Sequence, residues 1–314
     1  MSATATTTST RAPAAAPPTT TRPIVFKMPV PAFSDVAKPA NDIINKDFYH
    51  NAAAILDVKL KAPDGLAVNA KGTSPHEGDI SGSIEAKKSV AKGVTLTETW
   101  TTASFINTKL ELVDVIAQGV KAEFMGVAST KQGLGLKGQK LSLYFTQGAF
   151  NARGFFDYNP TSGNVNATLD GVFGHEGFVV GGEAGYDVQK AALTKYSAAV
   201  GYSTPVYSGA VTATNNLSVF AASYYHKVNA SVEAGVKAAY DTKSSSTVGL
   251  EIASKYRIDP TSFAKAKIND RGILQLAYNV KVNQGLTFGI GGSFDTQKLN
   301  EAGHKIGTSF TFEG

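Results

Sequence analysis

Apolar and polar residues alternate one by one along much of this chain, most regularly in its C-terminal part. Successive side chains of a β-strand point to opposite faces of a sheet, so a period of two predicts strands with one apolar and one polar face. Residues 248–312 read as four consecutive strands of this kind. Clear alternation also occurs further upstream, at residues 56–61, 141–145 and 228–237.

The number and spacing of these segments favour a large all-β fold. From residue 50 to the end we count about nineteen strand-like segments of roughly 8 to 12 residues each. A tilted strand needs roughly 9 to 11 residues to cross a bilayer, so this spacing is typical of a membrane-spanning β-barrel. A soluble β-sandwich shows the same alternation, and the pattern alone does not separate the two. Turn-forming residues separate the segments, for example at 63–65, 76–78, 159–160 and 215–216.

The polar face of the strands carries lysine repeatedly, which indicates that this face is in contact with water. In a packed core such lysines would be buried and unpaired, at a cost of several kcal/mol each. We therefore expect the polar face to line an aqueous lumen and the apolar face to meet lipid. Lysines in a lumen raise the local concentration of anions. Those that we expect on the lumen wall or on the adjoining helix are Lys38, Lys46, Lys59, Lys121, Lys140, Lys237 and Lys281.

The N-terminal part differs in composition from the rest. Residues 1–27 are mainly Ala, Ser, Thr and Pro, which bury too little apolar surface to fold, so we expect a disordered extension. Residues 28–49 follow as a helical segment, ahead of a barrel at residues 50–314. Apolar residues at helical spacing between 33 and 44 predict an amphipathic helix, which Pro39 should divide into two short pieces. Its apolar face needs a sheet or a barrel wall to lie on.

Composition and charge narrow the function classes. The chain has 31 Gly, 12 Tyr and 17 Phe but only 18% charged residues, which suits strands, tight turns and the aromatic girdles of membrane barrels. The absence of cysteine excludes a disulfide-stapled module, a thiolate zinc site and a cysteine nucleophile. The net charge of +5 is spread along the chain rather than gathered in a stripe for nucleic acid. No histidine pair has metal-ligand spacing and no nucleophile motif occurs, so we expect neither a cofactor nor catalysis.

Three local patterns resemble the voltage-dependent anion channels, the porins of the mitochondrial outer membrane, in their fungal form. The sequence YRIDP at 256–260, followed by AKIND at 266–270, is similar to the signature of the eukaryotic mitochondrial porins. Residues 30–50 are similar to the start of the fungal members, and residues 303–312 to the family's last strand and sorting signal. The chain departs from the animal members at residues 47–51, which replace a glycine-rich hinge, so hinge-swinging mechanisms transfer poorly.

The resemblance implies a single barrel of about 19 strands, the number known for this family, with the amphipathic helix in its lumen. It also implies a voltage-gated, weakly anion-selective channel that passes ATP, ADP, phosphate, organic acids and small ions across the mitochondrial outer membrane. The expected partners are membrane lipid, a second copy in a homo-oligomer and cytosolic kinases at the membrane, but no nucleic acid. Gating would involve the helix, represented by Phe33, Asp35 and Asp42.

One acidic residue breaks the alternation. Val94, Leu96, Glu98 and Trp100 share one face of a strand, which places Glu98 among apolar, lipid-facing residues. A lysine or arginine at the bilayer midplane costs ~2 to 4 kcal/mol, and an acid costs less. Glu98 resembles the membrane-facing glutamate of the family, which is implicated in partner binding, calcium sensitivity and self-association. A hydrated position at the membrane interface is the alternative.

Two other function classes fit part of the sequence. The related barrel of the outer-membrane protein translocase would pass unfolded precursors, but it normally has a longer N-terminal region and lacks the signature at 256–270. A soluble β-sandwich binding module would need no detergent to remain monodisperse. Both stay open as alternatives to the channel.

Overall fold

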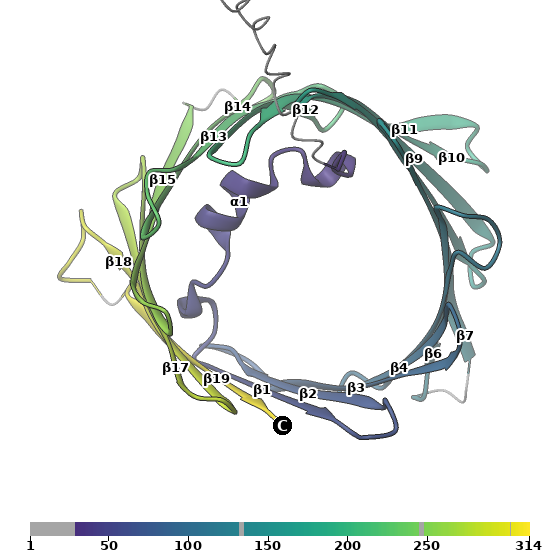
Figure 1. Cartoon of the computed structure of the whole chain (residues 1–314), viewed down its shortest axis with the longest axis horizontal. Coiled ribbons are helices and arrows are strands. Elements are labelled where there is room, and N and C mark those ends of the chain that lie inside the picture. The colour runs from purple at the N-terminus through teal and green to yellow at the C-terminus, as the bar shows by residue number, and fades with distance from the viewer. Residues whose placement is uncertain (1–28, 132–134, 245–247, 302) are drawn as a thin grey trace, which may run out of the picture.

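The computed structural model describes residues 29–131, 135–244, 248–301 and 303–314. Within these residues, nineteen β-strands form one closed sheet around a wide lumen (Figure 1). A short helical segment ahead of the first strand lies inside the lumen, against one side of the wall (Figure 1). The all-β barrel with a lumenal helix, which the alternation and the resemblance predict, is confirmed.

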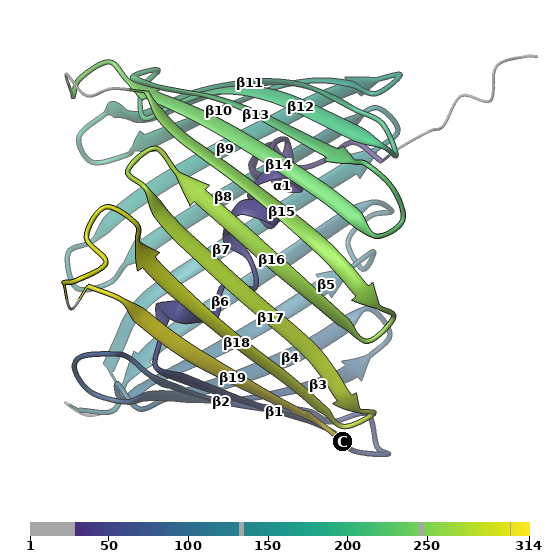
Figure 2. The same ribbon diagram turned by 90° about the vertical axis from the view of Figure 1, so that its left-hand side faces the viewer.

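The strands contain between 8 and 13 residues, close to the ~9 to 11 that a tilted strand needs to cross a bilayer. Figure 2 shows them running obliquely across the side of the barrel. The turn signals at 63–65, 76–78 and 215–216 lie between strands, and the one at 159–160 begins at the last residue of β8. The strands are β1 Ala54–Lys61, β2 Ala67–Ser74, β3 Ser81–Ala91, β4 Val94–Thr101, β5 Phe105–Val113, β6 Val120–Ser129, β7 Gly135–Gln147, β8 Phe150–Asn159, β9 Asn164–His175, β10 Phe178–Asp187, β11 Ala192–Ser203, β12 Tyr207–Thr214, β13 Val219–Lys227, β14 Val232–Asp241, β15 Gly249–Asp259, β16 Ser262–Asn269, β17 Ile273–Asn283, β18 Leu286–Asp295 and β19 Lys305–Glu313.

The first and last strands close the barrel. Strands that follow one another in the chain pair antiparallel, whereas β1 and β19 run parallel, with Ala54 opposite Thr308 and Lys59 opposite Glu313. An odd number of alternating strands leaves the two end strands pointing in the same direction, so only a parallel pairing can close the sheet. Closure leaves no free sheet edge in the membrane, where each unpaired backbone group would cost several kcal/mol.

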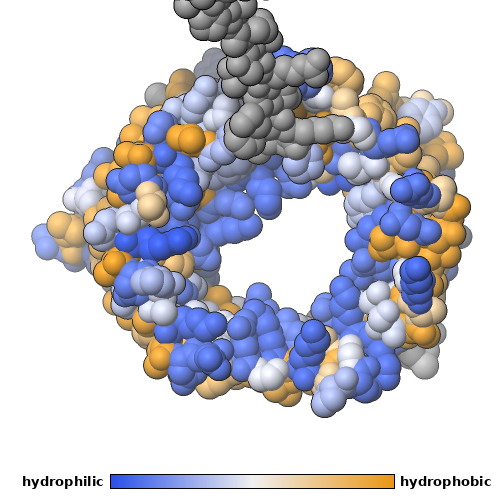
Figure 3. All heavy atoms as spheres, in the orientation of Figure 1, coloured by the Kyte–Doolittle hydropathy of each residue, from blue (hydrophilic) through white to orange (hydrophobic). Residues whose placement is uncertain are grey.

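Side chains of alternate residues point to the lumen and to the outside. In the β1/β2 pair, Leu56 lies beside Gly72 on the outer face, and Asp57 lies beside Lys71 on the inner face. Figure 3 shows the result, with hydrophilic residues around the opening and hydrophobic residues along the outer rim. A soluble monomer rarely exposes a large contiguous apolar patch, so this outer surface is a lipid-facing one. Its exposed side chains include Leu169, Phe173, Val180, Val200 and Ile290.

The C-terminal part differs from the sequence-based expectation in one respect. Residues 248–312 contain five strands rather than four, because β16 forms a separate strand between β15 and β17. In the middle of β16 the outward side chains are small, Ala264 and Ala266, and only Ile268 near its end is large, so the period of large apolar residues that reveals the other strands is missing there. The first strand begins at Ala54, somewhat later than the expected residue 50. Among the described residues, no helix is long and apolar enough to cross a membrane.

The helical segment consists of three short pieces. The 3₁₀-helix η1, Phe33–Asp35, leads into helix α1, Lys38–Asn45, and a second 3₁₀-helix η2, Tyr49–Asn51, precedes β1. Pro39 occupies the first turn of α1, where its missing amide costs no helical hydrogen bond. The division near Pro39 that the sequence predicts is therefore present. The expected disordered extension, residues 1–27, lies outside the described residues.

Candidate functional site: lumen wall and helix seat

The strand register places five of the expected lysines on the inner wall. Lys59, Lys121, Lys140, Lys237 and Lys281 lie opposite polar residues of neighbouring strands that also face the lumen, namely Asn69, Tyr144, Asp157, Glu251 and Thr287. The other two, Lys38 and Lys46, lie at the two ends of α1 and are exposed to the lumen. All seven are therefore inside the barrel. Their role in selecting anions stays a prediction.

Most of these lysines have a carboxylate partner. Lys121 Nζ lies 3.1 Å from Glu111 Oε1 and 2.9 Å from Glu123 Oε1, between the two acids. Lys46 Nζ donates to Asp42 Oδ2 at 2.9 Å, and this hydrogen bond raises the pKa of Lys46. Positive and negative side chains are therefore paired along the wall and on the helix. Such pairs produce only a weak electrostatic field in the lumen. The shortest pairs of the other three lysines are Lys38 with Asp42 at 3.7 Å, Lys59 with Glu313 at 3.2 Å and Lys140 with Asp157 at 3.5 Å.

The apolar face of α1 lies on the wall formed by β13, β14 and β15. Ile43 and Ile44 are buried there against Ala253 of β15, with Tyr225 of β13 packed beside them. A second buried cluster, around Val36 and Val172, lies below η1, and Phe33 packs against it. The wall thus supplies the apolar surface that the amphipathic pattern of the segment requires.

Glycines on the inner wall let the helical segment approach the strand backbones closely. An added Cβ on Gly235 would lie 3.4 Å from the Cβ of Ile43, and one on Gly307 would overlap the backbone oxygens of Tyr49 and Ala52. A larger residue at these positions would push the segment into the lumen. The lumen-facing glycines beneath the segment are Gly174, Gly181, Gly201, Gly235, Gly289, Gly291 and Gly307.

Arg153 of β8 holds the start of the helical segment. Its Nε and Nη2 donate to the Asp170 carboxylate of β9 at 3.0 and 2.8 Å, and its Nη1 donates to the Ser34 hydroxyl at 3.2 Å. Nearby, Asn151 Nδ2 donates to the carbonyl oxygen of Val30 at 3.0 Å. The Asp170 side chain is only 1% exposed, so this ion pair is shielded from water.

Lys265 of β16 holds the C-terminal end of α1. Its Nζ donates to the carbonyl oxygens of Lys46 at 2.7 Å and of Asp42 at 3.3 Å. It also lies 3.9 Å from Asp47 Oδ2 and 4.9 Å from the centroid of the Phe48 ring. The Lys265 side chain is 1% exposed. Its positive charge is therefore buried against the helix C-terminus, where the last carbonyls carry partial negative charge.

Tyr49 and His50 fix the connection between α1 and β1. Asn279 Nδ2 donates to the Tyr49 hydroxyl oxygen at 2.5 Å, and burial raises the pKa of Tyr49 to about 12. His50 is buried, and its carbonyl oxygen contacts His76 Nε2 at 2.8 Å. Burial, together with nearby positive charges, lowers the pKa of the His50 imidazole. Both shifts favour the uncharged form of the ring.

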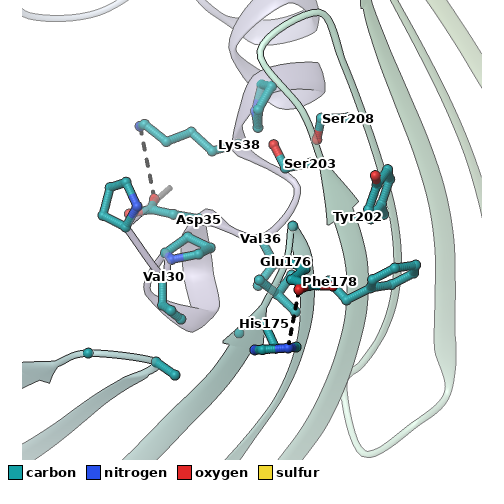
Figure 4. A pocket seen from close by; sticks show the side chains of 18 residues that line it. Val30, Asp35, Val36, Lys38, His175, Glu176, Phe178, Tyr202, Ser203 and Ser208 are labelled. Carbon is teal, nitrogen blue, oxygen red and sulfur yellow. Dashed lines mark ion pairs between the residues drawn. The ribbon is translucent and has the colours of Figure 1, made fainter. Parts of the chain in front are cut away.

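A pocket of about 620 Å³ opens where the helical segment begins (Figure 4). It lies between the segment and the ends of strands β9 to β12. Two ion pairs are drawn there, Lys38 with Asp35 at 3.9 Å and His175 with Glu176 at 3.7 Å. Asp35, one of the residues expected to take part in gating, is thus part of the lining. Other lining residues are Val30, Val36, Phe178, Tyr202, Ser203 and Ser208.

Glu98 lies on the outer face of β4, between Ala86 of β3 and Thr108 of β5. The Thr108 hydroxyl donates to Glu98 Oε1 at 3.0 Å. This bond satisfies one carboxylate oxygen from a neighbouring strand and lowers the cost of placing the acid toward lipid. The outward orientation follows from the register, and the role of Glu98 in association stays a prediction.

Sequence reasoning missed Arg153, Asp170 and Lys265. The first two are cross-strand partners in the β8/β9 hairpin, and the register around the turn at 159–160 is the signal that could have paired them. Lys265 belongs to β16, the strand that the alternation did not reveal. Within the described residues, no group of three His, Asp or Glu side chains is arranged to hold a metal ion.

A closed barrel of nineteen strands with an apolar outer surface and a charged lumen is a β-barrel channel. A barrel of about 8 strands is filled by its own side chains, whereas a barrel of roughly 16 strands or more encloses an aqueous passage. The strand number, the apolar outer belt and the charged inner wall therefore place the protein among the membrane pores.

Comparison with known proteins identifies the family. Residues 29–307 match the family model described as eukaryotic porin, and the chain belongs to this family. It is 55% identical over 289 residues to the mitochondrial outer membrane protein porin of Neurospora crassa, covering 91% of this chain and 100% of that protein. Identity is 45% to the porin of the same name from Candida albicans, covering 90% and 98%. It is 36% to non-selective voltage-gated ion channel 1 of Saccharomyces cerevisiae, covering 91% and 100%. The resemblance to the mitochondrial porins is confirmed.

Proposed function

We propose that this chain forms a voltage-gated pore of the mitochondrial outer membrane that passes metabolites and small ions. The observation that carries the proposal is the polar, charged lumen inside a closed barrel with an apolar outer face. The names of the relatives support the location and the gating. Two fungal relatives are named for the mitochondrial outer membrane, and a third is named a voltage-gated ion channel.

The pore prefers anions weakly. Lysines on the wall attract ATP, ADP, phosphate and organic acids and repel cations. Five of the seven expected lysines share their charge with carboxylates, which keeps the preference small. Among the described residues no ion pair within 4.0 Å involves Lys237 or Lys281, so of the seven expected lysines these two contribute most directly to the positive potential of the lumen.

The helical segment is the gating element of this proposal. Phe33, Asp35 and Asp42 belong to a segment that lies across the wall rather than in it, so that it can move without breaking the sheet. The barrel itself needs no such movement. A pore also needs no catalytic group, and we propose no enzymatic activity.

The outer surface defines the partners. Lipid surrounds the apolar belt of the barrel. Association with a second copy and docking of cytosolic kinases stay predictions, and Glu98 with its charge on the outer face is the residue through which we expect them to act.

Reconstitution into a planar bilayer tests the proposal. We expect a conductance that falls at high voltage of either polarity and a small reversal potential toward anions in a salt gradient. A preference for cations, or a barrel that conducts without voltage-dependent closure, would contradict it. A protein-translocating barrel would respond instead to added precursor peptide.

A further inference from the structure

The contact between α1 and the wall at its C-terminal end depends on one side chain. Within the described residues, the hydrogen bonds that join α1 and its C-cap Lys46 to the barrel come from Lys265, which bonds the carbonyls of Asp42 and Lys46. The rest of the α1 contact is apolar, through Ile43 and Ile44. Apolar contacts are non-directional, so Lys265 supplies the directional contact of α1 itself, ahead of the connection to β1 that Tyr49 and His50 fix.

Lys267, two residues further along β16, makes a different contact. It faces the same lumen and is nearly as buried, with 8% exposure against 4% for Lys265. Its Nζ pairs with Glu251 Oε1 of β15 at 2.9 Å, so it stabilises the wall and not the helix. The two lysines are matched in strand, face, burial and charge, and they differ in what they hold.

We call α1 seated when its apolar face lies on the wall formed by β13, β14 and β15, as it does here. In this position it leaves the lumen open (Figures 1 and 3). If α1 leaves the wall, it must enter this open space. Release also exposes Ile43 and Ile44 to water and removes the cation from the helix C-terminus, where a positive charge is stabilising. The seated state thus gains from Lys265, and the released state obstructs the passage.

We propose that Lys265 is the latch that holds α1 in its seat and thereby sets the voltage at which the pore closes. This inference rests on the proposed pore function for the voltage effect, whereas the latch itself is a contact that can be tested without conduction. Lys265 is a positioning residue in this mechanism, since it acts through the helix and not on the permeating ions.

Cysteine labelling tests the latch directly, because the natural chain has no cysteine. Ile44 belongs to α1 and is fully buried between the helix and the wall, with 0% exposure. A thiol introduced by Ile44→Cys therefore reacts only when the helix leaves the wall. Hydrogen bonds to charged groups contribute ~1.5 to 3 kcal/mol, so adding Lys265→Gln should raise the labelling rate by a membrane-impermeant maleimide about tenfold or more. The matched control Lys267→Gln should leave the rate unchanged. Equal rates for Lys265→Gln and the control would overturn the latch.

Asp47→Asn provides a second variant, which keeps the buried lysine in the chain and removes only a neighbouring charge, 3.9 Å from Lys265 Nζ. Asp47 is exposed and has a positive φ of 58°, a conformation that asparagine also tolerates. Removing its charge weakens the environment that holds the Lys265 ammonium group, so labelling should rise, though less than with Lys265→Gln. If Lys265→Gln fails to fold, an unchanged rate in Asp47→Asn rejects the proposal.

A reversible cross-link tests the voltage effect. The added Cβ on Gly235 would lie 3.4 Å from Ile43 Cβ, close to the ~3.5 to 4.5 Å of a disulfide, so Ile43→Cys with Gly235→Cys can tie α1 to β14. In reduced protein, Lys265→Gln should close the pore at lower voltage than its parent, and oxidation should abolish the difference. If reduced Lys265→Gln closes at the same voltage as its parent, the proposal that Lys265 sets the closure voltage is wrong. A parent that does not conduct contradicts the pore function and leaves the labelling result valid.

Discussion

Arg153 donates hydrogen bonds to the carboxylate of Asp170 through its Nε and Nη2, at 3.0 and 2.8 Å, and the Asp170 side chain is only 1% exposed. A third bond, from Nη1 to the Ser34 hydroxyl, connects this pair to the helical segment. Lys265 makes the corresponding contact at the other end. Directional polar contacts therefore fix both ends of the segment, while apolar packing holds its middle.

Loss of Arg153 should destabilise the protein strongly. Arg153→Ala leaves the Asp170 carboxylate buried without a partner, and breaking such a pair costs about 3 to 5 kcal/mol in free energy of unfolding. Adding Asp170→Asn should recover part of this loss. Unfolding in detergent can be followed by the fluorescence of the single tryptophan, Trp100. Lys140→Ala, which breaks an exposed pair with Asp157, is the control and should cost less than about 1 kcal/mol. A loss for Arg153→Ala as small as that of the control contradicts the structural role.

The strands could be predicted because their pattern is local. Lipid on one side and water on the other require alternation along each strand, and each strand shows it independently of the rest. The pattern failed at β16, where Ala264 and Ala266 replace large outward residues. The helix seat could not be predicted in this way, since Lys265 is far from Lys46 in sequence and meets it only when the segment lies inside the closed barrel. Amphipathicity predicted that α1 needs a wall, but not which strands provide it.

The close packing of the segment on glycine predicts sensitivity to a single methyl group. A Cβ at position 307 would overlap backbone oxygens of Tyr49 and Ala52. Gly307→Ala should therefore lower the free energy of unfolding by about 1 to 3 kcal/mol or displace the segment. Gly138→Ala is the control, because this lumen-facing glycine has no heavy atom within 4 Å of an added Cβ. Equal unfolding curves for the two variants would show that the segment has room to shift.

Acidification should weaken the connection between α1 and β1. The pKa of His50 is lowered from its ordinary value of 6.5 by burial and by the positive charges of Lys267, His76 and Lys305. The unfolded chain therefore takes up the proton more readily than the folded one. The stability contributed by neutral His50 is complete above about pH 6.5 and declines as the pH falls below that value.

Thermal denaturation midpoints measured at about pH 7.5 and pH 5.5 test this dependence. The midpoint of the natural protein should fall more on acidification than that of His50→Gln. The variant His76→Gln shows how much of the pH dependence of the midpoint comes from the neighbouring His76 ring, which contacts the His50 carbonyl oxygen. An identical pH dependence in the natural protein and in His50→Gln would assign the effect to other groups.

Reversing charges inside the lumen should reverse the ion preference. Lys46→Glu with Lys121→Glu should shift the reversal potential in a salt gradient toward cations. The effect should be larger because Lys121 in the natural protein partly offsets the charges of both Glu111 and Glu123. Lys88→Glu is the control, since Lys88 lies on the outer face of β3 and pairs with Asp64 in the β1/β2 turn. The shift should shrink near 1 M salt, where the Debye length is only about 3 Å. An unchanged potential in a folded, conducting double variant would remove these two lysines from the selectivity mechanism.

Glu98 provides a test of which face meets lipid. The Thr108 hydroxyl donates to it from the next strand, and a glutamine at position 98 can still accept this bond through its amide oxygen. Glu98→Gln removes a charge from the lipid-facing surface, so it should leave the free energy of unfolding unchanged or raise it, by no more than about 2 kcal/mol. Association between copies that depends on this charge should weaken at the same time.

A hydrophobic carbodiimide added from the membrane phase should modify Glu98 before the lumen-facing acids Asp57 and Glu233. The reagent concentrates in the hydrocarbon, and only an outward carboxylate meets it there. Thr108→Val should increase the rate further, because the carboxylate then loses its hydrogen-bond donor and is free to reach the reagent. Mass spectrometry of the labelled peptides distinguishes the three sites. Equal modification of all three acids, or a strong loss of stability in Glu98→Gln, would mean that this strand faces the other way.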